Sequence, residues 1–377
     1  MNIMFASHTY MGGDFVVGSH HLAREMNKLG HRVMHVSTPL SPFHALKWNN
    51  RDIQNRFRLW RGRARSLEEG PVNAVPMSLL PWEIAGPFYK KTKRNWMLPS
   101  LRGLMKQHGM ENIDLLLMDQ PRFVGLDQLL QPKRTVYRPT DIYSKMTGDP
   151  VVAQAEAELL GRVSALVSTS APVHDELIAY NPQLPSMILE NGVEYEHFST
   201  PADEPEELKS IAGPRAIYVG AIDERLDVEG LARLAQNKPH ISFVIVGPCP
   251  EAAARAFQGL TNLHLLGAKP YSRIPAFLQH SDVALLPLSH HPANAGRSPM
   301  KLYEYMAAGL PAVVTKTPEL SRRDEQHLYF YHDLDDMAAQ LERALSERSS
   351  REEVQRRAAS QAWHSKAAQL LAFIDNL

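Results

Sequence analysis

Residues 283–315, which read VALLPLSHHPANAGRSPMKLYEYMAAGLPAVVT, decide the fold. The stretch opens on an apolar run at 283–286, continues through a loop with several prolines, enters a helical segment and ends on a second apolar run at 312–315. Short apolar runs bounded by turn residues are typical of buried parallel strands. The stretch therefore predicts a strand, a loop, a helix and a strand in that order, which is the repeating unit of an α/β domain.

Similar apolar runs alternate with helical patterns along the chain and fall into two series. The first series comprises residues 2–6, 32–36, 114–118, 135–137, 165–168 and 186–189. The second comprises residues 216–219, 242–246, 263–266, 283–286, 312–315 and 328–331. Alternation of this kind predicts two parallel sheets wrapped by helices, with ligands at the carboxyl ends of the strands.

A turn segment separates the two series. The tripeptide Asn-Gly-Val at 191–193 precedes a stretch rich in Pro and Glu at 201–207, which is typical of a surface linker. We therefore expect an α/β fold of two Rossmann-like domains, residues 1–190 and residues 191–355, with parallel sheets that face each other across a cleft. The helical segment 356–377 is expected to pack back onto the first domain.

The composition excludes several functional classes. Lys plus Arg and Asp plus Glu are balanced at 41 each, so no global field favours nucleic acid as a partner. The single cysteine, Cys249, excludes an intramolecular disulfide framework and fits a reducing compartment. The first residues show no signal peptide, and no stretch approaches the roughly 18 to 20 apolar residues that span a bilayer. These features predict a cytoplasmic protein.

The helical segment that follows the loop begins close to Ser298 and Met300. A helix start carries unpaired amides and about half a positive charge, so Ser298 and the amides after it can hold a phosphate oxygen. Lys301 adds a mobile cation, and Glu304, one turn further on, can accept hydrogen bonds from two ribose hydroxyls. The alternative is that Lys301 and Glu304 form an i, i+3 surface ion pair.

The same segment carries a resemblance to a known family. SPMKLYEYM at 298–306, followed by Gly309 and Pro311, resembles the nucleotide-sugar segment of two-domain B-type (GT-B) glycosyltransferases. The tripeptide at 191–193 is similar to the interdomain segment of those enzymes, and residues 218–220 resemble the first strand and loop of their donor domain.

Within that family, Met300, Lys301 and the loop at 220–225 are most similar to the inverting glucuronosyltransferase of xanthan assembly. The resemblance implies transfer of a sugar from a UDP-sugar, with glucuronate as one candidate, to a hydroxyl of a saccharide or lipid-linked oligosaccharide in polysaccharide synthesis. It implies no cofactor beyond the UDP-sugar substrate.

The resemblance also places further residues and leaves alternatives open. Gly220 and Arg225 would lie near the phosphates, although a salt bridge from Arg225 to Asp223 or Asp227 is an equal alternative. Many retaining members carry a glutamate at the position of Gly296, so its absence here favours inversion. Retention of configuration, a sugar-nucleotide epimerase of the same architecture and a non-catalytic sugar-nucleotide sensor stay as alternatives.

The nucleotide base is expected after the strand at 263–266. Ala268 and Tyr271 lie in the loop that follows, whose amides and carbonyls can contact the edge of a pyrimidine. The alternative is that Pro270 and Ser272 cap the next helix.

The catalytic base for inversion is expected from the first domain. Asp141 closely follows the strand at 135–137, and it also stands where the xanthan-type enzymes carry their base. The alternative role for Asp141 is to cap the turn that begins at Ile142. Asp119 and His8, which follow two other strands of this domain, are competing candidates.

No metal site is expected. Asp333 and Asp335 match a D-x-D pattern, but they lead directly into a helix, so helix capping is the better interpretation. The histidine pairs at 20–21 and 290–291 lack a third ligand at a metal spacing. A helix dipole and a lysine can stabilise a leaving diphosphate without a metal ion.

Two basic and aromatic stretches of the first domain favour contact with an anionic membrane surface. The first contains Lys47, Arg51, Arg56, Arg58, Arg61, Arg63 and Arg65 with Trp48, Phe57 and Trp60. The second contains Lys90, Lys91, Lys93 and Arg94 with Trp82, Phe88, Tyr89, Trp96 and Met97. A solvated basic face with a few packed aromatic residues is the alternative. Membrane contact would place the protein at the inner face of the plasma membrane and would suit a lipid-linked acceptor.

Overall fold

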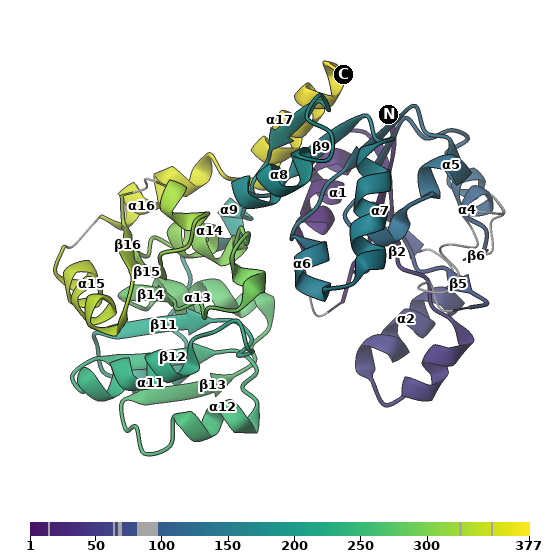
Figure 1. Cartoon of the computed structure of the whole chain (residues 1–377). Coiled ribbons are helices and arrows are strands. Elements are labelled where there is room, and N and C mark those ends of the chain that lie inside the picture. The colour runs from purple at the N-terminus through teal and green to yellow at the C-terminus, as the bar shows by residue number, and fades with distance from the viewer. Residues whose placement is uncertain (14–15, 63–64, 67–69, 81–96, 324–325, 348–349) are drawn as a thin grey trace. The chain divides into compact units, whose positions relative to one another are not determined.

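The computed structural model describes residues 1–13, 16–62, 65–66, 70–80, 97–323, 326–347 and 350–377. The chain forms two compact units (Figure 1). Unit 1 comprises Met1–Glu190 and Lys366–Leu377, and unit 2 comprises Asn191–Ser365. Each unit is built on one large sheet of mainly parallel strands, as the alternation of apolar runs and helical patterns predicts.

The sheet of unit 1 has β1 near its middle. Its strands lie in the spatial order β10 (Ser186–Ile188), β9 (Ala165–Ser168), β8 (Arg134–Tyr137), β7 (Leu115–Met118), β1 (Asn2–Ser7), β2 (Arg32–Ser37), β4 (Val72–Ala74) and β3 (Arg65–Ser66). Neighbouring strands run parallel except β3, which runs antiparallel to β4. The β1 side chains from Ile3 to Ala6 are fully buried, because a central parallel strand is covered on both faces.

The helices of unit 1 follow its strands in the chain. They are α1 (Gly18–Lys28), α2 (Arg51–Arg61), α4 (Leu101–Gln107), α5 (Leu126–Leu130), α6 (Tyr143–Thr147), α7 (Pro150–Leu160) and α8 (Ala171–Ile178), with 3-10 turns η1 (Pro42–Lys47) and η2 (Pro121–Phe123). A two-stranded antiparallel ribbon joins β5 (Met77–Ser78) to β6 (Met97–Leu98).

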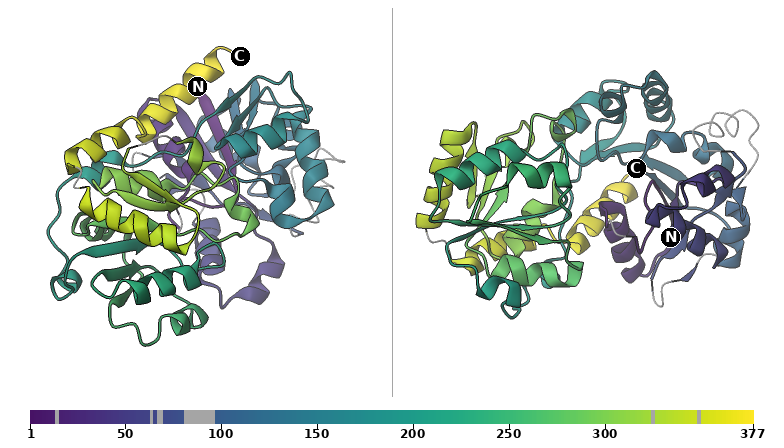
Figure 2. Two further views of the ribbon diagram at one scale, coloured as in Figure 1. Left: turned by 60° about the vertical axis from the view of Figure 1, so that its left-hand side comes forward. Right: turned by 90° about the horizontal axis from the view of Figure 1, so that it is seen from below.

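The sheet of unit 2 is parallel throughout its described pairs. Its strands lie in the order β13 (Leu263–Gly267), β12 (Ser242–Val246), β11 (Arg215–Val219), β14 (Val283–Leu286), β15 (Ala312–Thr315) and β16 (Leu328–Tyr331). Along β11, Ile217 and Val219 pack into one core, whereas Ala216 and Tyr218 pack into another. Because alternate side chains point to opposite faces, helices must cover both faces of this sheet, as Figure 2 shows.

The helices of unit 2 lie before, between and after its strands in the chain. They are α9 (Tyr195–Ser199), α10 (Glu206–Lys209), α11 (Val228–Asn237), α12 (Glu251–Ala256), α13 (Ile274–Gln279), α14 (Met300–Ala307), α15 (Leu334–Ser346) and α16 (Arg351–Ala359), with 3-10 turns η3 (Tyr271–Arg273), η4 (Pro292–Asn294) and η5 (Leu320–Arg322).

Helix α14 lies between β14 and β15, as the stretch 283–315 predicts. Proline occupies the N-cap position at Pro299. One face of the helix buries Leu302, Tyr303, Tyr305 and Met306 in unit 2, which holds α14 against the sheet. The opposite face is left for polar side chains.

The C-terminal segment differs from the expectation of a single helix over 356–377. The structure has α16 and then α17 (Trp363–Asp375), and the chain between them pairs with Val193. The Val193 amide donates to the Gln361 carbonyl at 3.0 Å, and the Trp363 amide donates to the Val193 carbonyl at 3.1 Å. Because these bonds interrupt the helix, α16 packs against α14 in unit 2, and only residues from Lys366 onward group with unit 1. The expectation was therefore wrong for the residues before Lys366.

Candidate functional site at the carboxyl edge of the second sheet

The carboxyl edge of the unit 2 sheet is shaped by two glycines that contact each other. Gly220 follows β11 with φ +153°, and Gly247 follows β12 with φ +154°. A Cβ atom built on Gly247 would lie 1.9 Å from the Gly220 carbonyl oxygen, so a larger residue at 247 would clash with the backbone. The two strand ends therefore approach so closely that backbone forms this part of the edge.

Lys301 lies directly against Gly220. A Cβ atom on Gly220 would come within 2.4 Å of Lys301 Cε and 2.9 Å of Nζ. Burial lowers the pKa of Lys301, the nearby Arg297 lowers it further, and Glu304 opposes the shift. The ammonium of α14 thus lies over the end of β11, in a poorly hydrated position where an anionic ligand would be attracted strongly.

Glu304 follows one turn later on α14 and is half-buried. Burial raises the pKa of this carboxyl to about 7, the charge of Lys301 opposes the rise, and Glu194 adds to it. In the described part of the chain, Lys301 and Glu304 interact through their charges rather than through a direct hydrogen bond. This arrangement differs from the exposed i, i+3 ion pair that was the alternative interpretation.

Arg225 forms the salt bridge to Asp223 that the sequence analysis gave as the alternative to phosphate binding. Its Nε donates to Asp223 Oδ1 at 2.9 Å, and Nη2 makes a second, short contact with Asp223 Oδ2. Asp227, the other possible partner, instead accepts from the Gly230 amide at 2.9 Å and caps α11. The pairing raises the pKa of Arg225, and the charges of Arg225 and Asp223 both act on Lys301. Arg225 therefore belongs to the edge that Gly220 and Lys301 form.

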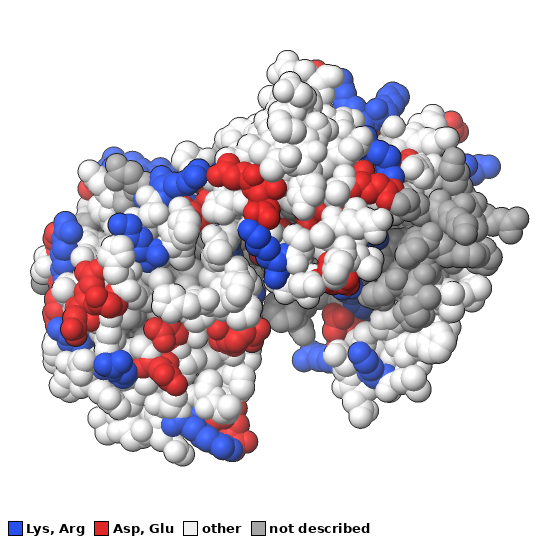
Figure 3. All heavy atoms as spheres, viewed as in Figure 1, with Lys and Arg blue, Asp and Glu red and all other residues white. Residues whose placement is uncertain are grey.

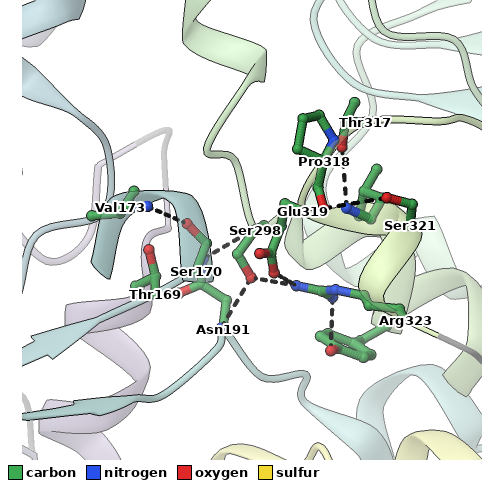
Figure 4. Close-up of polar contacts among 12 residues, drawn as sticks. Thr169, Ser170, Val173, Asn191, Ser298, Thr317, Pro318, Glu319, Ser321 and Arg323 are labelled. Atoms are coloured by element: carbon green, nitrogen blue, oxygen red, sulfur yellow. Dashed lines mark hydrogen bonds and ion pairs between the residues drawn. The ribbon is translucent and has the colours of Figure 1, made fainter. Parts of the chain in front are cut away.

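Ser298 and Met300 lie at the start of α14. Met300 is half-buried, whereas Ser298 is buried and its hydroxyl accepts a hydrogen bond from Arg323 Nη2 at 3.0 Å (Figure 4). Asn191 Nδ2 donates to the Ser298 carbonyl at 2.9 Å. These bonds hold Ser298 in place, and the first amides of α14 come directly after it in the chain.

Ala268 and Tyr271 lie after β13, at the outer edge of the sheet and separated from β11 by β12. Both are exposed. The Tyr271 ring stacks on His197 with centroids 4.8 Å apart, and Pro270 occupies the N-cap position of η3 without a side-chain cap. The aromatic stack offers a flat surface to a nucleotide base, but described contacts do not join it to Lys301 and Glu304.

The three candidate bases, Asp141, Asp119 and His8, share the carboxyl edge of the unit 1 sheet. His8 follows β1, and Asp119 follows the adjacent β7. Burial lowers the pKa of His8, whereas the charges of Asp119 and Asp141 raise it, so both carboxylates lie within electrostatic range of His8. Topology therefore brings together side chains that are far apart in the sequence.

These three groups differ in access to solvent. Asp119 is only 3% exposed, and burial raises its pKa although Arg138 opposes the rise. Asp141 is half-buried and accepts a hydrogen bond from Thr140 Oγ1 at 3.0 Å. The N-cap of α6 is Ile142, without a side-chain cap, so Asp141 does not have the capping role that was its alternative.

Sequence reasoning missed two buried charged residues in unit 2. Glu319 and Arg323 follow β15 and form an ion pair with Oε1 and Nη2 3.0 Å apart. Their i, i+4 spacing is the only signal in the sequence, and that spacing usually marks an exposed pair.

The charged residues on the face of unit 2 drawn in Figure 3 show the ordinary pattern, in which both signs are interspersed.

The D-x-D pattern at Asp333 and Asp335 has a structural role. Asp333 Oδ1 accepts from the Asp336 amide at 2.9 Å and caps α15, as expected. Within the described ranges, no group of three or more His, Cys, Asp or Glu side chains is placed to hold a metal ion.

The basic and aromatic stretches are described only in part. Phe43, Leu46 and Trp48 are exposed on η1 and just after it. Residues 63–64 and 82–96, which include Arg63 and most of the second cluster, lie outside the described residues. None of the helices in the described ranges combines the length and hydropathy that a bilayer-spanning segment requires.

Comparison with known proteins agrees with the donor-domain resemblance. Residues 213–347, which lie within unit 2, match the family model described as Glycosyl transferases group 1. A Bacillus subtilis (strain 168) protein named for a teichuronic acid biosynthesis glycosyltransferase, TuaH, is 30% identical over 202 residues. The matched region covers 50% of this chain and 50% of that protein, so the match spans about half the length of the relative.

Solved structures match over the whole chain. Anabaena HepE in complex with UDP and glucose has a TM-score of 0.69 and 14% identity, with 100% of both chains covered. Sucrose-phosphate synthase from Thermosynechococcus elongatus has a TM-score of 0.71 and 14% identity, with 100% of this chain and 99% of that chain covered. At such identity the likeness shows the fold, which is the GT-B fold.

Proposed function

We propose that the chain is a glycosyltransferase that uses a uridine diphosphate sugar, and that unit 2 holds this donor. One observation carries the proposal: the Lys301 ammonium lies against Gly220 at the carboxyl edge of the sheet, with Glu304 one turn away. Parallel α/β sheets bind ligands at this edge, and a helix start attracts phosphate. The family match to residues 213–347 supports the same site.

Each part of the donor has a candidate partner in the proposal. The diphosphate would bind the amides of Ser298 and Met300, the side chain of Lys301, and the loop of Gly220 and Arg225, while the ribose hydroxyls would donate to Glu304. The base would lie beside Ala268 and Tyr271, where the exposed ring of Tyr271 allows stacking. HepE has been crystallised with UDP and with UDP-glucose, which supports uridine as the nucleoside.

A uronate, in particular glucuronate, is the proposed donor sugar. Arg297 lies close enough to Lys301 to lower the pKa of that lysine, so the edge carries a cation beyond those assigned to the diphosphate. A guanidinium can bind a carboxylate through two parallel hydrogen bonds. The resemblance to the xanthan-type glucuronosyltransferase group supports the same sugar. A donor panel that compares UDP-glucuronate with UDP-glucose tests this choice.

The proposed transfer inverts the anomeric centre, with Asp141 as the base. The acceptor oxygen attacks the anomeric carbon while the carboxylate of Asp141 takes its proton, and the bond to the diphosphate breaks so that UDP leaves with the electron pair. The helix dipole of α14 and Lys301 would stabilise the leaving diphosphate without a metal ion. Determination of the product anomer by NMR distinguishes inversion from retention.

The proposed acceptor is a saccharide or a lipid-linked oligosaccharide at an anionic membrane surface. Leu46 is 86% exposed and Trp48 is 47% exposed, and the exposed cations Lys47, Arg51 and Arg58 lie in the same segment. Exposed apolar side chains among cations favour anionic lipid. The printed name of TuaH supports a role in polysaccharide synthesis. Sedimentation with phosphatidylglycerol vesicles, compared with phosphatidylcholine vesicles, tests this contact.

Binding of UDP, measured by calorimetry, tests the proposed function. Gly220→Ala should weaken binding, because the added methyl group would displace Lys301. Gly259→Ala is the matched control, since Gly259 also has a positive φ, of +82°, but has open space around its Cβ position. Failure of the wild-type protein to bind any sugar nucleotide, or equal affinity of all three proteins for UDP, would contradict the proposed site.

A further inference from the structure

Unit 2 buries an ion pair beside the start of α14. The side chains of Arg323 and Glu319 are 4% and 3% exposed, and Figure 4 shows them beside Ser298, which precedes the helix. Both residues lie in the segment that follows β15. Strand β15 is the neighbour of β14 in the sheet. The proposed donor contacts use neither residue.

The guanidinium of Arg323 holds α14 at two places. Nη1 donates to Tyr303 Oη at 2.7 Å, and Nη2 donates to Ser298 Oγ at 3.0 Å. The guanidinium carbon also lies 5.1 Å from the centroid of the Tyr303 ring. Because Ser298 precedes the helix and Tyr303 lies within it, one cation fixes both the entry segment and the body of α14.

Three further hydrogen bonds complete this support. The Asn191 amide donates to Ser298 Oγ at 3.4 Å, and Asn191 Nδ2 donates to the Ser298 carbonyl at 2.9 Å. The Val219 amide donates to Tyr305 Oη at 3.2 Å, which ties the helix to the end of β11 beside Gly220. The helix that carries Lys301 and Glu304 and the entry segment before it are therefore held by hydrogen bonds from Arg323, Asn191 and Val219.

A buried ion pair is a weak means of adding stability. Removal of two charges from water costs free energy that their attraction only partly offsets, and apolar replacements of similar volume are often as stable. Loss of one partner is harmful, because the other charge stays buried alone. The geometry of Arg323 and Glu319 therefore calls for a role other than stability.

We propose that Arg323, oriented by Glu319, is a positioning residue that sets the start of α14 for the donor. By holding Ser298 and Tyr303, it would place Lys301 at the diphosphate and Glu304 at the ribose. The hydroxyl of Ser298 then acts inside the protein and contributes through the position of the amides that follow it. This inference rests on the proposed function, because it assigns the pair to the same donor site.

The test separates positioning from stability with apolar replacements. Arg323→Met alone should lower both the thermal midpoint and the affinity for UDP, because Glu319 is left buried without its partner. The double variant Arg323→Met with Glu319→Leu should regain most of the thermal midpoint. Its affinity for UDP should stay about tenfold weaker than that of the wild type, because Ser298 and Tyr303 are no longer held.

Arg215 provides a matched control. Its Nη1 donates to Glu204 at 2.7 Å and to the His280 carbonyl at 2.9 Å, but it lies at the amino end of β11, away from the proposed donor edge. Arg215→Met should lower the thermal midpoint without changing the dissociation constant of UDP. A loss of affinity equal to that of the double variant would overturn the positioning role.

The outcomes distinguish this inference from the proposed function. A folded double variant that binds UDP as tightly as the wild type would show that the pair is only structural. If the double variant does not fold, Tyr303→Phe and Ser298→Ala each remove one contact of Arg323, and unchanged UDP affinity in both would overturn the inference. A wild-type protein that binds no UDP would overturn the proposed function and the inference together.

Discussion

The two units carry their candidate polar groups at the same place, the carboxyl edge of a parallel sheet, but assemble them in different ways. In unit 2, Lys301 and Glu304 share the first turns of one helix, and Gly220 faces Lys301 from a neighbouring strand. In unit 1, the three candidate bases follow three different strands, β1, β7 and β8. Site residues that share one helix can be recognised from their spacing in the sequence. Site residues that follow several strands are brought together only by the order of those strands in the sheet.

The electrostatics of the two edges also differ. Lys301, Arg297 and Arg225 make the unit 2 edge rich in cations, which suits an anionic ligand. The unit 1 edge buries the Asp119 carboxyl next to Arg138, and burial raises the pKa of Asp119. If unit 2 binds the donor and unit 1 supplies the base, substitutions in the two units should separate binding from transfer.

The largest expected effect is on the rate of transfer after Asp141→Asn. Loss of a general base lowers kcat by roughly 10²-fold to 10⁴-fold, and the affinity for UDP should not change. The rate of UDP release at saturating donor and acceptor measures this effect. Asp175→Asn, which changes an exposed carboxylate on α8, is the control. An unchanged kcat for the Asp141 variant would exclude Asp141 as the base and would direct the search to His8.

The second effect is the loss of UDP affinity in Lys301→Ala. A hydrogen bond to a charged group contributes about 1.5 to 3 kcal/mol, so the dissociation constant should rise roughly 10-fold to 100-fold. Lys209→Ala removes an exposed lysine on α10 and should leave the constant unchanged. Calorimetry measures the dissociation constant of UDP for both variants. Equal constants for the Lys301 and Lys209 variants would contradict the assignment of donor binding to the unit 2 edge.

The third effect concerns the pH dependence of stability in Glu304→Gln. Burial raises the pKa of Glu304 from 4.5 to about 7. Below pH 4.5 the group is neutral in both states, so no stability is lost. Between pH 4.5 and 7 the unfolded chain ionises first, so stability falls as pH rises, by about 1 to 3 kcal/mol in total.

Glu304→Gln should remove that loss, so the variant should be more stable than the wild type at pH 8 while binding UDP less tightly. Urea unfolding at pH 5 and pH 8 measures the difference. Glu251→Gln, at a carboxylate that is 85% exposed, is the control and should retain the wild-type pH dependence. A Glu304 variant with the wild-type pH dependence would contradict the raised pKa of this carboxyl.

The smallest expected effect is on stability alone. Asp333→Ala removes the N-cap of α15 and should lower the free energy of unfolding by about 1 kcal/mol, without a change in UDP affinity. Thermal unfolding and calorimetry measure the two quantities. Loss of affinity for UDP in this variant would show that Asp333 does more than cap α15.

Much of the fold could be predicted because parallel strands buried on both faces are nearly continuous apolar runs. Strands β14 and β15 fall on the predicted residues for this reason. The strands β3, β5 and β6 could not be predicted, because two residues each are too few for any periodicity. The break between α16 and α17 was also missed, since it depends on pairing with the distant Val193.

The candidate site shows the same limit. Lys301 and Glu304 could be grouped from the helix period alone. The partner of Arg225 could not be chosen, because Asp223 and Asp227 stand at equal distances in sequence, and only the structure shows that Asp227 caps α11. Arg323 was missed because charged residues are rarely buried unless paired, and its contacts with Ser298 and Tyr303 depend on the tertiary fold.

A crystal structure of the protein with UDP is the most direct test of the donor edge in unit 2. We expect a diphosphate oxygen within about 2.7 to 3.2 Å of Lys301 Nζ, beside Gly220, and ribose hydroxyls that donate to Glu304. A diphosphate bound elsewhere, or Lys301 directed into solvent in that complex, would contradict the proposal.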